Sequence, residues 1–416
     1  MIRKIVLALV ALVSMITYAQ DGASSPYSFY GLGTLQFQGT VENRTMGGMT
    51  TYSDSLHVNL RNPAGYGALR FTNFAVGASH KEVQFTTNEI DEDNSNTTID
   101  YVAIGIPIGK KWGVGFGILP YSSVGYNIQN IDEEIGTSAR FSGSGGLNKA
   151  YLSAGYEILP DLRLGGTVSY NFGSIRNLSI IGFEGLELGT QEINRSDLSG
   201  LSLNFGAQFE ADFSKDLRFY ANAAYTMESN LNSENSRELA SVLFISTGDV
   251  VPVETRNVII ADTDLTLPSS VVFGFGLGEK NKWFAGTEVS LEETSNFSNR
   301  SFSIPDVTYK NAAKYRLGGF YTPEYLSVNS YWKRMTYRAG VRYEELGLNI
   351  RGQDISEFGM SFGVGLPAGR SLSNVNLGFE YGQRGTTEAG LIKENFFNVF
   401  LSLSFNGKWF QKLKFN

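Results

Sequence analysis

The chain has 416 residues, and its 41 aspartates and glutamates outnumber its 34 lysines and arginines, which leaves a formal net charge of −7. This acidic balance, with no basic stripe along the chain, argues against a nucleic-acid partner. Because the chain contains no cysteine, it can form neither a disulfide scaffold nor a lipoprotein acylated on cysteine.

Residues 1–19 have the pattern of a secretory signal peptide. A basic start at Arg3 and Lys4 is followed by an apolar run from Ile5 to Ile16 and by a small-residue exit that ends at Ala19. This order predicts cleavage after Ala19. A membrane anchor is the alternative, but the apolar run is shorter than the ~20 residues that a helix needs to span a bilayer.

Residues 20–69 are rich in glycine, serine and asparagine and show no sustained alternation of apolar and polar residues. Aromatic side chains such as Tyr27, Phe29 and Phe37 argue against a disordered tail. We therefore expect this stretch to fold as a plug inside a barrel, with a disordered tail as the alternative.

From residue 70 onward, apolar and polar residues alternate in segments of about ten residues, the length of a tilted membrane strand. In one segment Leu201, Leu203 and Phe205 alternate with Ser202 and Asn204. A soluble β-sandwich would alternate in the same way. The candidate strands, about fourteen in number, cover residues 70–85, 98–108, 111–122, 147–158, 161–175, 196–212, 216–228, 268–278, 281–292, 309–321, 336–345, 356–366, 373–383 and 394–406.

The connections between these segments favour a barrel over a sandwich. Short connections such as 109–111 and 214–216 alternate with long ones, the longest running from 229 to 267, and one short-side connection, 322–335, is longer than the rest. Outer-membrane barrels have short periplasmic turns and long external loops. We therefore predict an all-β, transmembrane antiparallel β-barrel of about fourteen strands over residues 70–416, in the outer membrane of a Gram-negative bacterium. The abundance of glycine and aromatic residues and a mean hydropathy of −0.13 fit this class.

The triplet Asn62-Pro63-Ala64 stands shortly before the first predicted strand. A plug that carries this triplet, followed by about fourteen strands, resembles the FadL-type family of outer-membrane channels for long-chain fatty acids and aromatic hydrocarbons. The resemblance covers the whole mature chain in layout, although its local signature is short. It implies a plug, called the hatch, that shifts to open a path, and a kink in the third strand that makes a lateral hole in the barrel wall.

Pro120 lies in the predicted third strand, shortly after Gly113, Gly115 and Gly117. A missing backbone donor beside glycines weakens a strand ladder. We therefore assign the kink and lateral opening that the resemblance implies to Gly117 and Pro120. The alternative is that Pro120 marks the extracellular end of the strand.

The resemblance also implies an external hydrophobic groove in the loops after the fifth and seventh strands. Apolar clusters in these two predicted loops need burial, either against each other as a lid or against a hydrophobic ligand. The residues assigned to hydrophobic capture are Ile180, Ile181, Phe183, Leu186, Leu239, Val242 and Leu243.

The sequence offers little for catalysis. His57 and His80 are the only histidines, neither has a nucleophile at an informative spacing, and no G-x-S-x-G motif is present; both are expected to make hydrogen bonds in the lumen. The acidic run Asp91-Glu92-Asp93 favours a solvated loop over a cation site or a bridge to lipopolysaccharide. We expect no enzyme activity, no metal and no cofactor.

Several charged residues fall on the polar faces of the predicted strands: Arg218, Glu210, Glu288, Arg316, Arg338, Arg342, Glu344 and Glu380. In a plugged barrel such charges must pair with one another or with plug residues such as Arg44, Arg61 and Asp54. Alternatively, one of the arginines could hold the carboxylate of a ligand.

These features support passive uptake of hydrophobic small molecules, fatty-acid-like or hydrocarbon, past the hatch and out through the wall near Pro120. The alternative is a FadL-like barrel that acts as a docking or assembly subunit of an outer-membrane secretion (type IX) or barrel-insertion complex, since fold alone does not fix function. An outer-membrane lipase is disfavoured by the missing catalytic set. The expected partners are outer-membrane lipid and lipopolysaccharide, a hydrophobic ligand or detergent in the lumen, and, in the alternative, the proteins of a complex.

Overall fold

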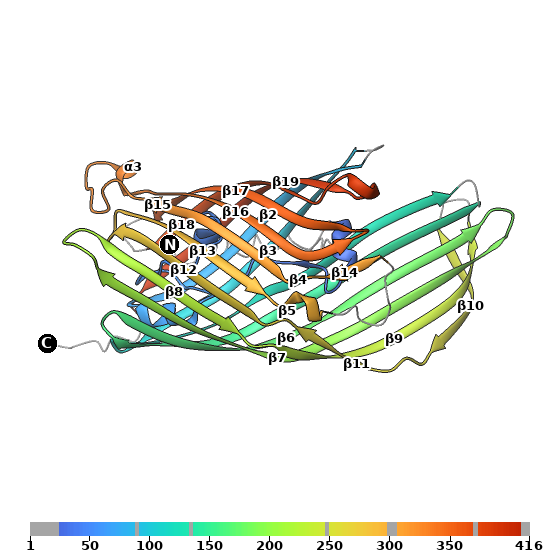
Figure 1. Ribbon diagram of the computed structural model, residues 1–416, viewed down its shortest axis with the longest axis horizontal. Coiled ribbons are helices and arrows are strands. Elements are labelled where there is room, and N and C mark those ends of the chain that lie inside the picture. The colour runs from blue at the N-terminus through green and yellow to red at the C-terminus, as the bar shows by residue number, and fades with distance from the viewer. Residues whose placement is uncertain are drawn as a thin grey trace, which may run out of the picture.

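The computed structural model describes residues 25–87, 91–132, 136–245, 249–297, 306–368 and 373–408. The predicted signal peptide, residues 1–19, lies outside the described residues. The strands lie side by side, tilted, and form the wall of a long cylinder (Figure 1). Within the described ranges, no helix has the length and apolar character needed to cross a membrane.

Antiparallel strands make up nearly all of the fold. Their bounds are β2 Thr72–Thr86, β3 Asp91–Ile108, β4 Trp112–Asp132, β5 Thr137–Leu159, β6 Leu162–Phe183, β7 Leu188–Asp212, β8 Arg218–Thr226, β9 Ser229–Phe244, β10 Val250–Val258, β11 Thr263–Leu267, β12 Ser270–Glu279, β13 Trp283–Glu292, β14 Val307–Tyr309, β15 Ala312–Tyr321, β16 Thr336–Ile350, β17 Gln353–Ala368, β18 Ser373–Arg384 and β19 Lys393–Gly407. Among the described residues, three short helices lie in their connections: η3 Thr294–Asn296, α3 Tyr331–Arg334 and η4 Glu388–Gly390.

Some of these strands are pieces of one wall strand. Both β8 and β9 pair with β7, while β12 pairs with β8 and both β10 and β11 pair with β9. In the same way β14 and β15 both pair with β16. The described part of the chain therefore builds fourteen wall strands, which confirms the predicted count. The wall closes where β19 pairs with β2, from Gly407 opposite Thr72 to Lys393 opposite Thr86.

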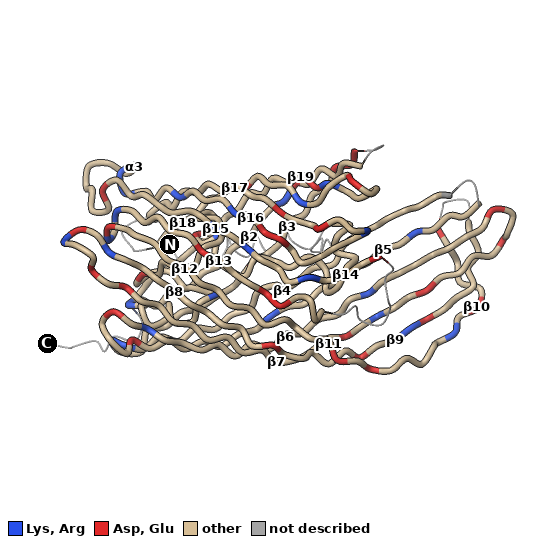
Figure 2. The backbone as a smooth tube through the Cα atoms, in the orientation of Figure 1, with Lys and Arg blue, Asp and Glu red and all other residues tan. Residues whose placement is uncertain are grey.

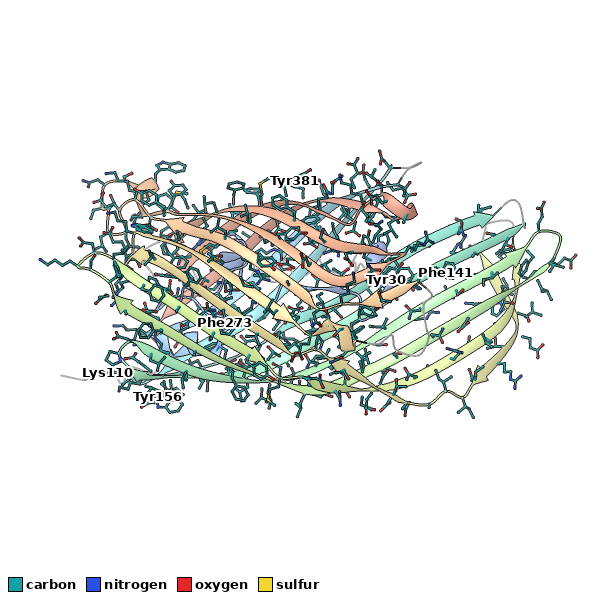
Figure 3. The ribbon with its side chains drawn as sticks, in the orientation of Figure 1. Tyr30, Lys110, Phe141, Tyr156, Phe273 and Tyr381 are labelled. Carbon is teal, nitrogen blue, oxygen red and sulfur yellow. The ribbon has the colours of Figure 1, made fainter. Side chains whose placement is uncertain are left out.

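The alternation of side chains follows from what each face meets. Large apolar side chains such as Phe273 of β12 and Tyr381 of β18 are exposed on the outer surface (Figure 3), where an outer-membrane barrel meets lipid. Buried polar side chains such as Asn222, Glu288 and Glu380 face the interior. Hydrocarbon outside and a polar interior thus explain the period of two.

At one end of the barrel, several wall strands extend far beyond the band of exposed apolar side chains. On β7, Leu201 and Phe205 are exposed apolar residues, whereas Arg195, six residues before Leu201 on the same face, is an exposed charge. Figure 2 shows charged residues along this part of the wall. The outer extension, as we name it, consists of residues 123–132, 137–148, 174–183, 188–199, 229–244 and 250–267. The short turns lie at the opposite end, so the outer extension is on the extracellular side.

The outer extension corrects the sequence analysis, which placed long loops after the third, fifth and seventh strands. These stretches are strands, including all of β9 and β10. Both faces of the outer extension lie outside the lipid, so its strands need no continuous apolar face and lack the alternation that marks a membrane strand.

The chain before β2 forms short elements: η1 Pro26–Phe29, β1 Thr34–Leu35, α2 Val41–Arg44 and η2 Pro63–Ala68. We name residues 25–69 the N-terminal segment. Its η2 contacts β3 to β7, while α2 contacts β17 to β19 on the far side. Because the segment touches opposite sides of a closed barrel, it lies in the lumen. A domain boundary at residue 69 and a role as a hatch stay predictions.

Candidate functional site in the barrel lumen

The triplet Asn62-Pro63-Ala64 starts η2 and fixes it to the wall. The Asn62 side chain accepts a hydrogen bond from the Ala64 backbone N–H (3.0 Å) and donates one to the Ala207 carbonyl of β7 (3.2 Å). Pro63 occupies the first helical position, where a backbone N–H is not needed. All three residues are buried. The triplet is therefore a local capping device at the barrel wall.

Inward-facing glycines of the wall form a seat for η2. A Cβ atom on Gly113 would lie 1.9 Å from the Tyr66 carbonyl oxygen, and one on Gly115 would lie 1.9 Å from the Tyr66 ring. On the neighbouring strands, a Cβ on Gly165 would lie 2.4 Å from the Pro63 backbone. Only glycine permits so close an approach. Gly113 and Gly115, the first two glycines of the string GxGxG, therefore belong to this seat rather than to a dinucleotide-binding loop.

The opposite side of the lumen holds the N-terminal segment through ion pairs. Arg44 binds Glu380 of β18 with two bonds of 2.5 and 2.8 Å, and Arg342 of β16 donates to the same carboxylate at 2.7 Å. Arg342 also pairs with Glu357 of β17. Through Glu357 the pairing continues to Arg384.

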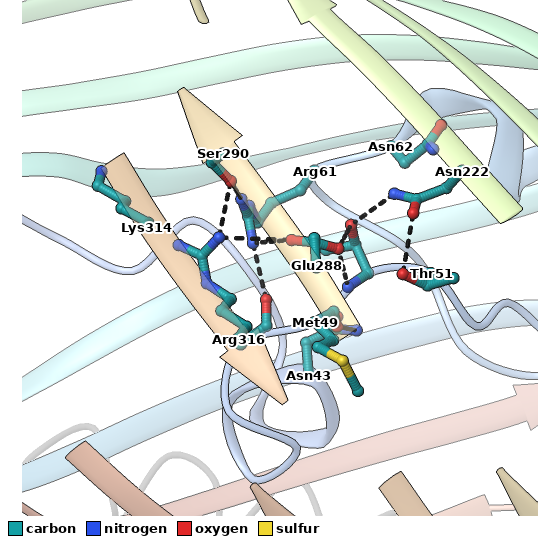
Figure 4. Close-up of polar contacts among 12 residues, drawn as sticks. Asn43, Met49, Thr51, Arg61, Asn62, Asn222, Glu288, Ser290, Lys314 and Arg316 are labelled. Atoms are coloured by element: carbon teal, nitrogen blue, oxygen red, sulfur yellow. Dashed lines mark hydrogen bonds and ion pairs between the residues drawn. The ribbon is translucent and has the colours of Figure 1, made fainter. Parts of the chain in front are cut away.

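A second group of ion pairs surrounds Glu288 of β13 (Figure 4). Its carboxylate accepts hydrogen bonds from the Thr50 backbone N–H and hydroxyl, both at 2.8 Å, and from Arg61 at 3.2 Å. Arg316 of β15 also pairs with Glu288, at 3.4 Å. On its other side Arg316 pairs with Glu344 of β16 at 3.3 Å.

The two groups join because Arg342 also pairs with Glu344, at 3.4 Å. We name the whole set the lumen ion network; its members are Arg44, Arg61, Glu288, Arg316, Arg342, Glu344, Glu357, Glu380, Arg384 and Glu394. Ser25 reaches the far end of it through a hydrogen bond to Glu394. The expectation that lumenal charges pair with one another or with plug residues is confirmed for Glu288, Arg316, Arg342, Glu344 and Glu380, and for Arg44 and Arg61 of the plug, whereas Asp54 of the plug pairs with His57.

Other charges have different partners. Glu210 pairs with Arg163 at 2.6 Å, and Arg218 with Asp212 at 2.5 Å. Arg338 donates to Asn376 at 3.0 Å.

Neighbouring strands of the wall separate next to Pro120, and we name this place the wall parting. Strands β3 and β4 pair only up to Val102 opposite Ile118, while β4 continues to Asp132. A register shift between Pro120 and Ser122 interrupts the pairing of β4 with β5 at the same level. The separation of the strands lies at the level of Pro120, and both a kink there and its use as an exit stay predictions. Gly117 lies in the last paired rows, where a Cβ would be 2.3 Å from the Val102 carbonyl oxygen.

The N-terminal segment occupies this parting. Its strand β1 pairs with β4, Thr34 opposite Ser123 and Leu35 opposite Ser122. Just below, Gln36 donates its backbone N–H to the Tyr121 carbonyl, at 2.9 Å. The Gln38 side chain donates to the Pro120 carbonyl, also at 2.9 Å. The unpaired edge of β4 at this level is therefore bonded by the chain itself.

The apolar lining of the upper lumen is also covered by the segment. Leu32 belongs to an apolar cluster with buried residues of six strands, and Phe29 contacts the Tyr126 ring edge-on at 5.2 Å between centroids. The wall residues of this apolar cluster are Val124, Tyr126, Leu147, Ile175, Leu198, Leu231, Leu265 and Leu267.

The residues predicted to capture a ligand lie in strands rather than loops, except Leu186. Ile180, Ile181 and Phe183 belong to β6, and Leu239, Val242 and Leu243 belong to β9. Ile180 and Val242 meet in one small apolar cluster with Ala240. Beside it is a cavity of about 670 Å³, lined by Leu178, Ile180 and polar residues that include Arg140 and Arg176. The two apolar clusters thus pack against each other in part, and ligand capture stays a prediction.

The two histidines differ in environment. His57 lies in the lumen, where its Nδ1 is 2.7 Å from Asp54 and its Nε2 is 3.3 Å from the Asn374 amide. His80 of β2 is exposed, and its ring bonds Thr97 of β3 at 2.8 Å. The expectation of a lumenal hydrogen bond is confirmed for His57 and wrong for His80, because the alternation of β2 turns position 80 outward.

The Asp54–His57 pair responds to pH. Burial by itself raises the pKa of Asp54, but His57 and the backbone N–H groups of Leu56 and His57 together hold that pKa below its ordinary value. Burial by itself lowers the pKa of His57, but the Asp54 carboxylate raises the pKa above its ordinary value. The pair is therefore an ion pair at mildly acidic pH.

We expect Asp54→Asn to remove a stabilisation that depends on pH. The contribution of Asp54 is present above its ordinary pKa of about 3.9, and that of His57 is complete below its ordinary pKa of about 6.5. The stability difference between wild type and Asp54→Asn should thus be largest between these values and shrink as pH rises through the raised pKa of His57. Thermal unfolding of both proteins in detergent across pH measures it. A difference independent of pH would contradict the assignment, and His57→Gln should also remove the pH dependence.

Fold comparisons place the protein among outer-membrane barrels. It is similar to the Pseudomonas putida toluene transporter TodX, with a TM-score of 0.62 at 16% identity over 90% of this chain and 100% of that chain. It is also similar to a Pseudomonas aeruginosa FadL homologue, with a TM-score of 0.58 at 12% identity over 90% of this chain and 98% of that chain. At these identities the likeness concerns the fold. The protein is thus a bacterial outer-membrane β-barrel with the FadL-type fold.

The family is shown by the sequence itself. The BamG family model matches residues 1–416, and the chain belongs to the BamG family. No curated protein matches the sequence.

Proposed function

We propose that this protein is a docking or assembly subunit of an outer-membrane barrel-insertion complex, and that its barrel is a fixed platform without catalytic activity. The observation that carries the proposal is the double attachment of the N-terminal segment. The segment lies on the glycine seat on one side and is held by the lumen ion network on the other. It also bonds the edge of β4 at the wall parting. These attachments on both sides of the lumen support a segment that stays in place.

The free-energy cost of moving the N-terminal segment out of its place supports a barrel that acts as a fixed platform. Displacing it separates Arg44 from Glu380 and Arg61 from Glu288, and both carboxylates are fully buried. Breaking a buried ion pair by removing one partner costs roughly 3–5 kcal/mol. A channel that opens for each solute would have to break both pairs each time, with Arg342 left as the partner of Glu380 and Arg316 left as the partner of Glu288. The match to the BamG family model is compatible with this proposal.

The second candidate is uptake of hydrophobic compounds by a shift of the N-terminal segment. The observation that favours it is the wall parting at Pro120, which lies beside the apolar cluster around Leu32 and Val124. The fold likeness to a toluene transporter points the same way. In this candidate Ile180 and Val242 belong to the capture site, the segment is the hatch, and the solute leaves through the wall.

One comparison separates the two candidates. The tagged full-length protein is purified from native outer membranes in mild detergent, and the same protein is reconstituted in liposomes with radiolabelled toluene. The proposal expects protein partners in fixed stoichiometry and toluene entry no faster than into protein-free liposomes. Recovery of the barrel without partners, together with protein-dependent entry that a Pro120→Ala variant alters, would overturn it in favour of uptake.

A further inference from the structure

The outer extension is an open sheet with two free edges. On one side β4 loses its partner β3 above Ile118. On the other side β10 and β11 pair with β9 alone, because the pairing of β12 with β13 begins only at Ser270. An unpaired edge presents a row of backbone donors and acceptors to other chains.

The two edges are built differently. The edge of β10 contains Pro252 and a register shift between Pro252 and Glu254. Prolines and bulges are devices that keep a free edge from pairing. The part of β4 from Asn127 to Ile131, which has no strand partner on this side among the described residues, reads Asn-Ile-Gln-Asn-Ile, with no proline, no lysine and no register shift. The edge of β4 from Asn127 to Ile131 lacks these devices.

The backbone groups that face this edge follow from the pairing. Gly125 turns its N–H and C=O away from β5, because the N–H bonds the Ser28 hydroxyl and the C=O accepts from the Ser25 N–H. In an antiparallel ladder alternate residues face alternate sides. The backbone groups of Asn127, Gln129 and Ile131 therefore face the free edge, and no described residue bonds to them. Their side chains are exposed, that of Ile131 to 63%.

The chain already adds a strand to this same edge. Strand β1 pairs antiparallel with Ser122 and Ser123, directly below the unpaired stretch. The geometry of the edge thus accepts an extended backbone at Ser122 and Ser123.

We propose that the edge of β4 at residues 127–131 binds an extended strand of a partner polypeptide by β-strand addition. Asn127, Gln129 and Ile131 present their N–H and C=O groups at every second position of the strand. This spacing matches that of the backbone groups of another extended peptide. On the inner face Ile128 and Phe141 are partly buried apolar residues, whereas Asn127 and Gln129 lie on the outer face. The bound strand should therefore alternate, with apolar side chains toward Ile128. This inference rests on the proposed docking function and supplies its surface.

A proline substitution tests the backbone contact directly. The N–H of residue 129 faces the edge, so Gln129→Pro removes one donor for the partner and leaves the β4–β5 ladder intact, whereas Gln129→Ala keeps that donor. A photo-crosslinking amino acid is placed at position 127 or 131 of the full-length protein in native outer membranes. We expect crosslinks from the two positions to fall in one partner segment, four residues apart. Gln129→Pro should reduce the crosslinked partner more than tenfold, while Gln129→Ala leaves it unchanged.

The outcomes separate this inference from the proposed function. If partners still copurify with the Gln129→Pro protein and crosslinking equals that of Gln129→Ala, the edge is not the docking surface, although the docking function stands. Crosslinks to residues 20–24 of the same chain would also overturn the inference, since the chain would then cover its own edge. A wild-type protein that has neither copurifying partners nor crosslinks would overturn both. Heat-dependent migration of each variant on gels checks that the barrel has folded.

Discussion

Replacing Glu380 by glutamine should open the lumen and destabilise the barrel. The Glu380 carboxylate is fully buried and accepts hydrogen bonds from Arg44 of the N-terminal segment and Arg342 of the wall. Without its charge, both arginines lose a buried counterion, and breaking such a pair costs roughly 3–5 kcal/mol. Urea unfolding in detergent measures the loss, and planar bilayers measure the ion current that follows release of the segment.

Glu254→Gln is the matched control, because Glu254 is an exposed carboxylate of β10 without an ion pair to the described residues. We expect it to unfold at the wild-type urea concentration and to conduct no more than the wild type. If Glu380→Gln unfolds at the same urea concentration as the control and conducts no more current than the control, the lumen ion network does not hold the segment. If it is destabilised but stays closed, the glycine seat alone suffices to keep the segment in place.

Gly113→Ala should push the N-terminal segment off its seat. The added Cβ would lie 1.9 Å from the Tyr66 carbonyl oxygen and 2.6 Å from its carbonyl carbon. Those atoms belong to the backbone of η2, so no side-chain rotation relieves the contact. Overpacking of this kind costs typically 1–3 kcal/mol. Limited trypsin digestion of the folded protein measures the displacement through faster cleavage after Arg61, whose guanidinium now bonds the Gly48 carbonyl and Glu288.

Gly166→Ala provides the control at a strand glycine of similar kind. A Cβ at Gly166 meets its nearest atom, in the Phe205 ring, at 3.8 Å, an ordinary contact. Alanine allows the unfolded chain fewer backbone conformations than glycine does. This variant should therefore be as stable as the wild type or slightly more stable. Equal trypsin cleavage of the two variants would contradict the seat as the reason for glycine at position 113.

Much of the wall could be predicted because the bilayer acts on each strand locally. In the segment around Leu201, Leu203 and Phe205, one face meets hydrocarbon and the other the interior, so the period of two is imposed residue by residue. The number of wall strands and the position of the first strand after Asn62-Pro63-Ala64 follow from that pattern. The outer extension could not be found in this way, because its strands lie beyond the lipid and need no apolar face.

The site was predictable in kind but not in its pairings. The sequence indicated that Arg44 and Arg61 must find carboxylates in a closed lumen. It could not indicate Glu380, which is 336 residues from Arg44, or Glu288, 227 residues from Arg61. Likewise Gly113 and Gly115 were interpreted only as residues that weaken the strand ladder, and nothing in the sequence revealed that Tyr66 packs against them.

The sequence by itself determined that the chain alternates in membrane-length strands, because contact with lipid or lumen selects each side chain through its immediate surroundings. Only the tertiary structure decided which wall charge holds which residue of the N-terminal segment, where β3 leaves β4, and which edge remains unpaired. These features depend on how far each strand pairs with its neighbour when the barrel closes, and closure is a property of the whole sheet.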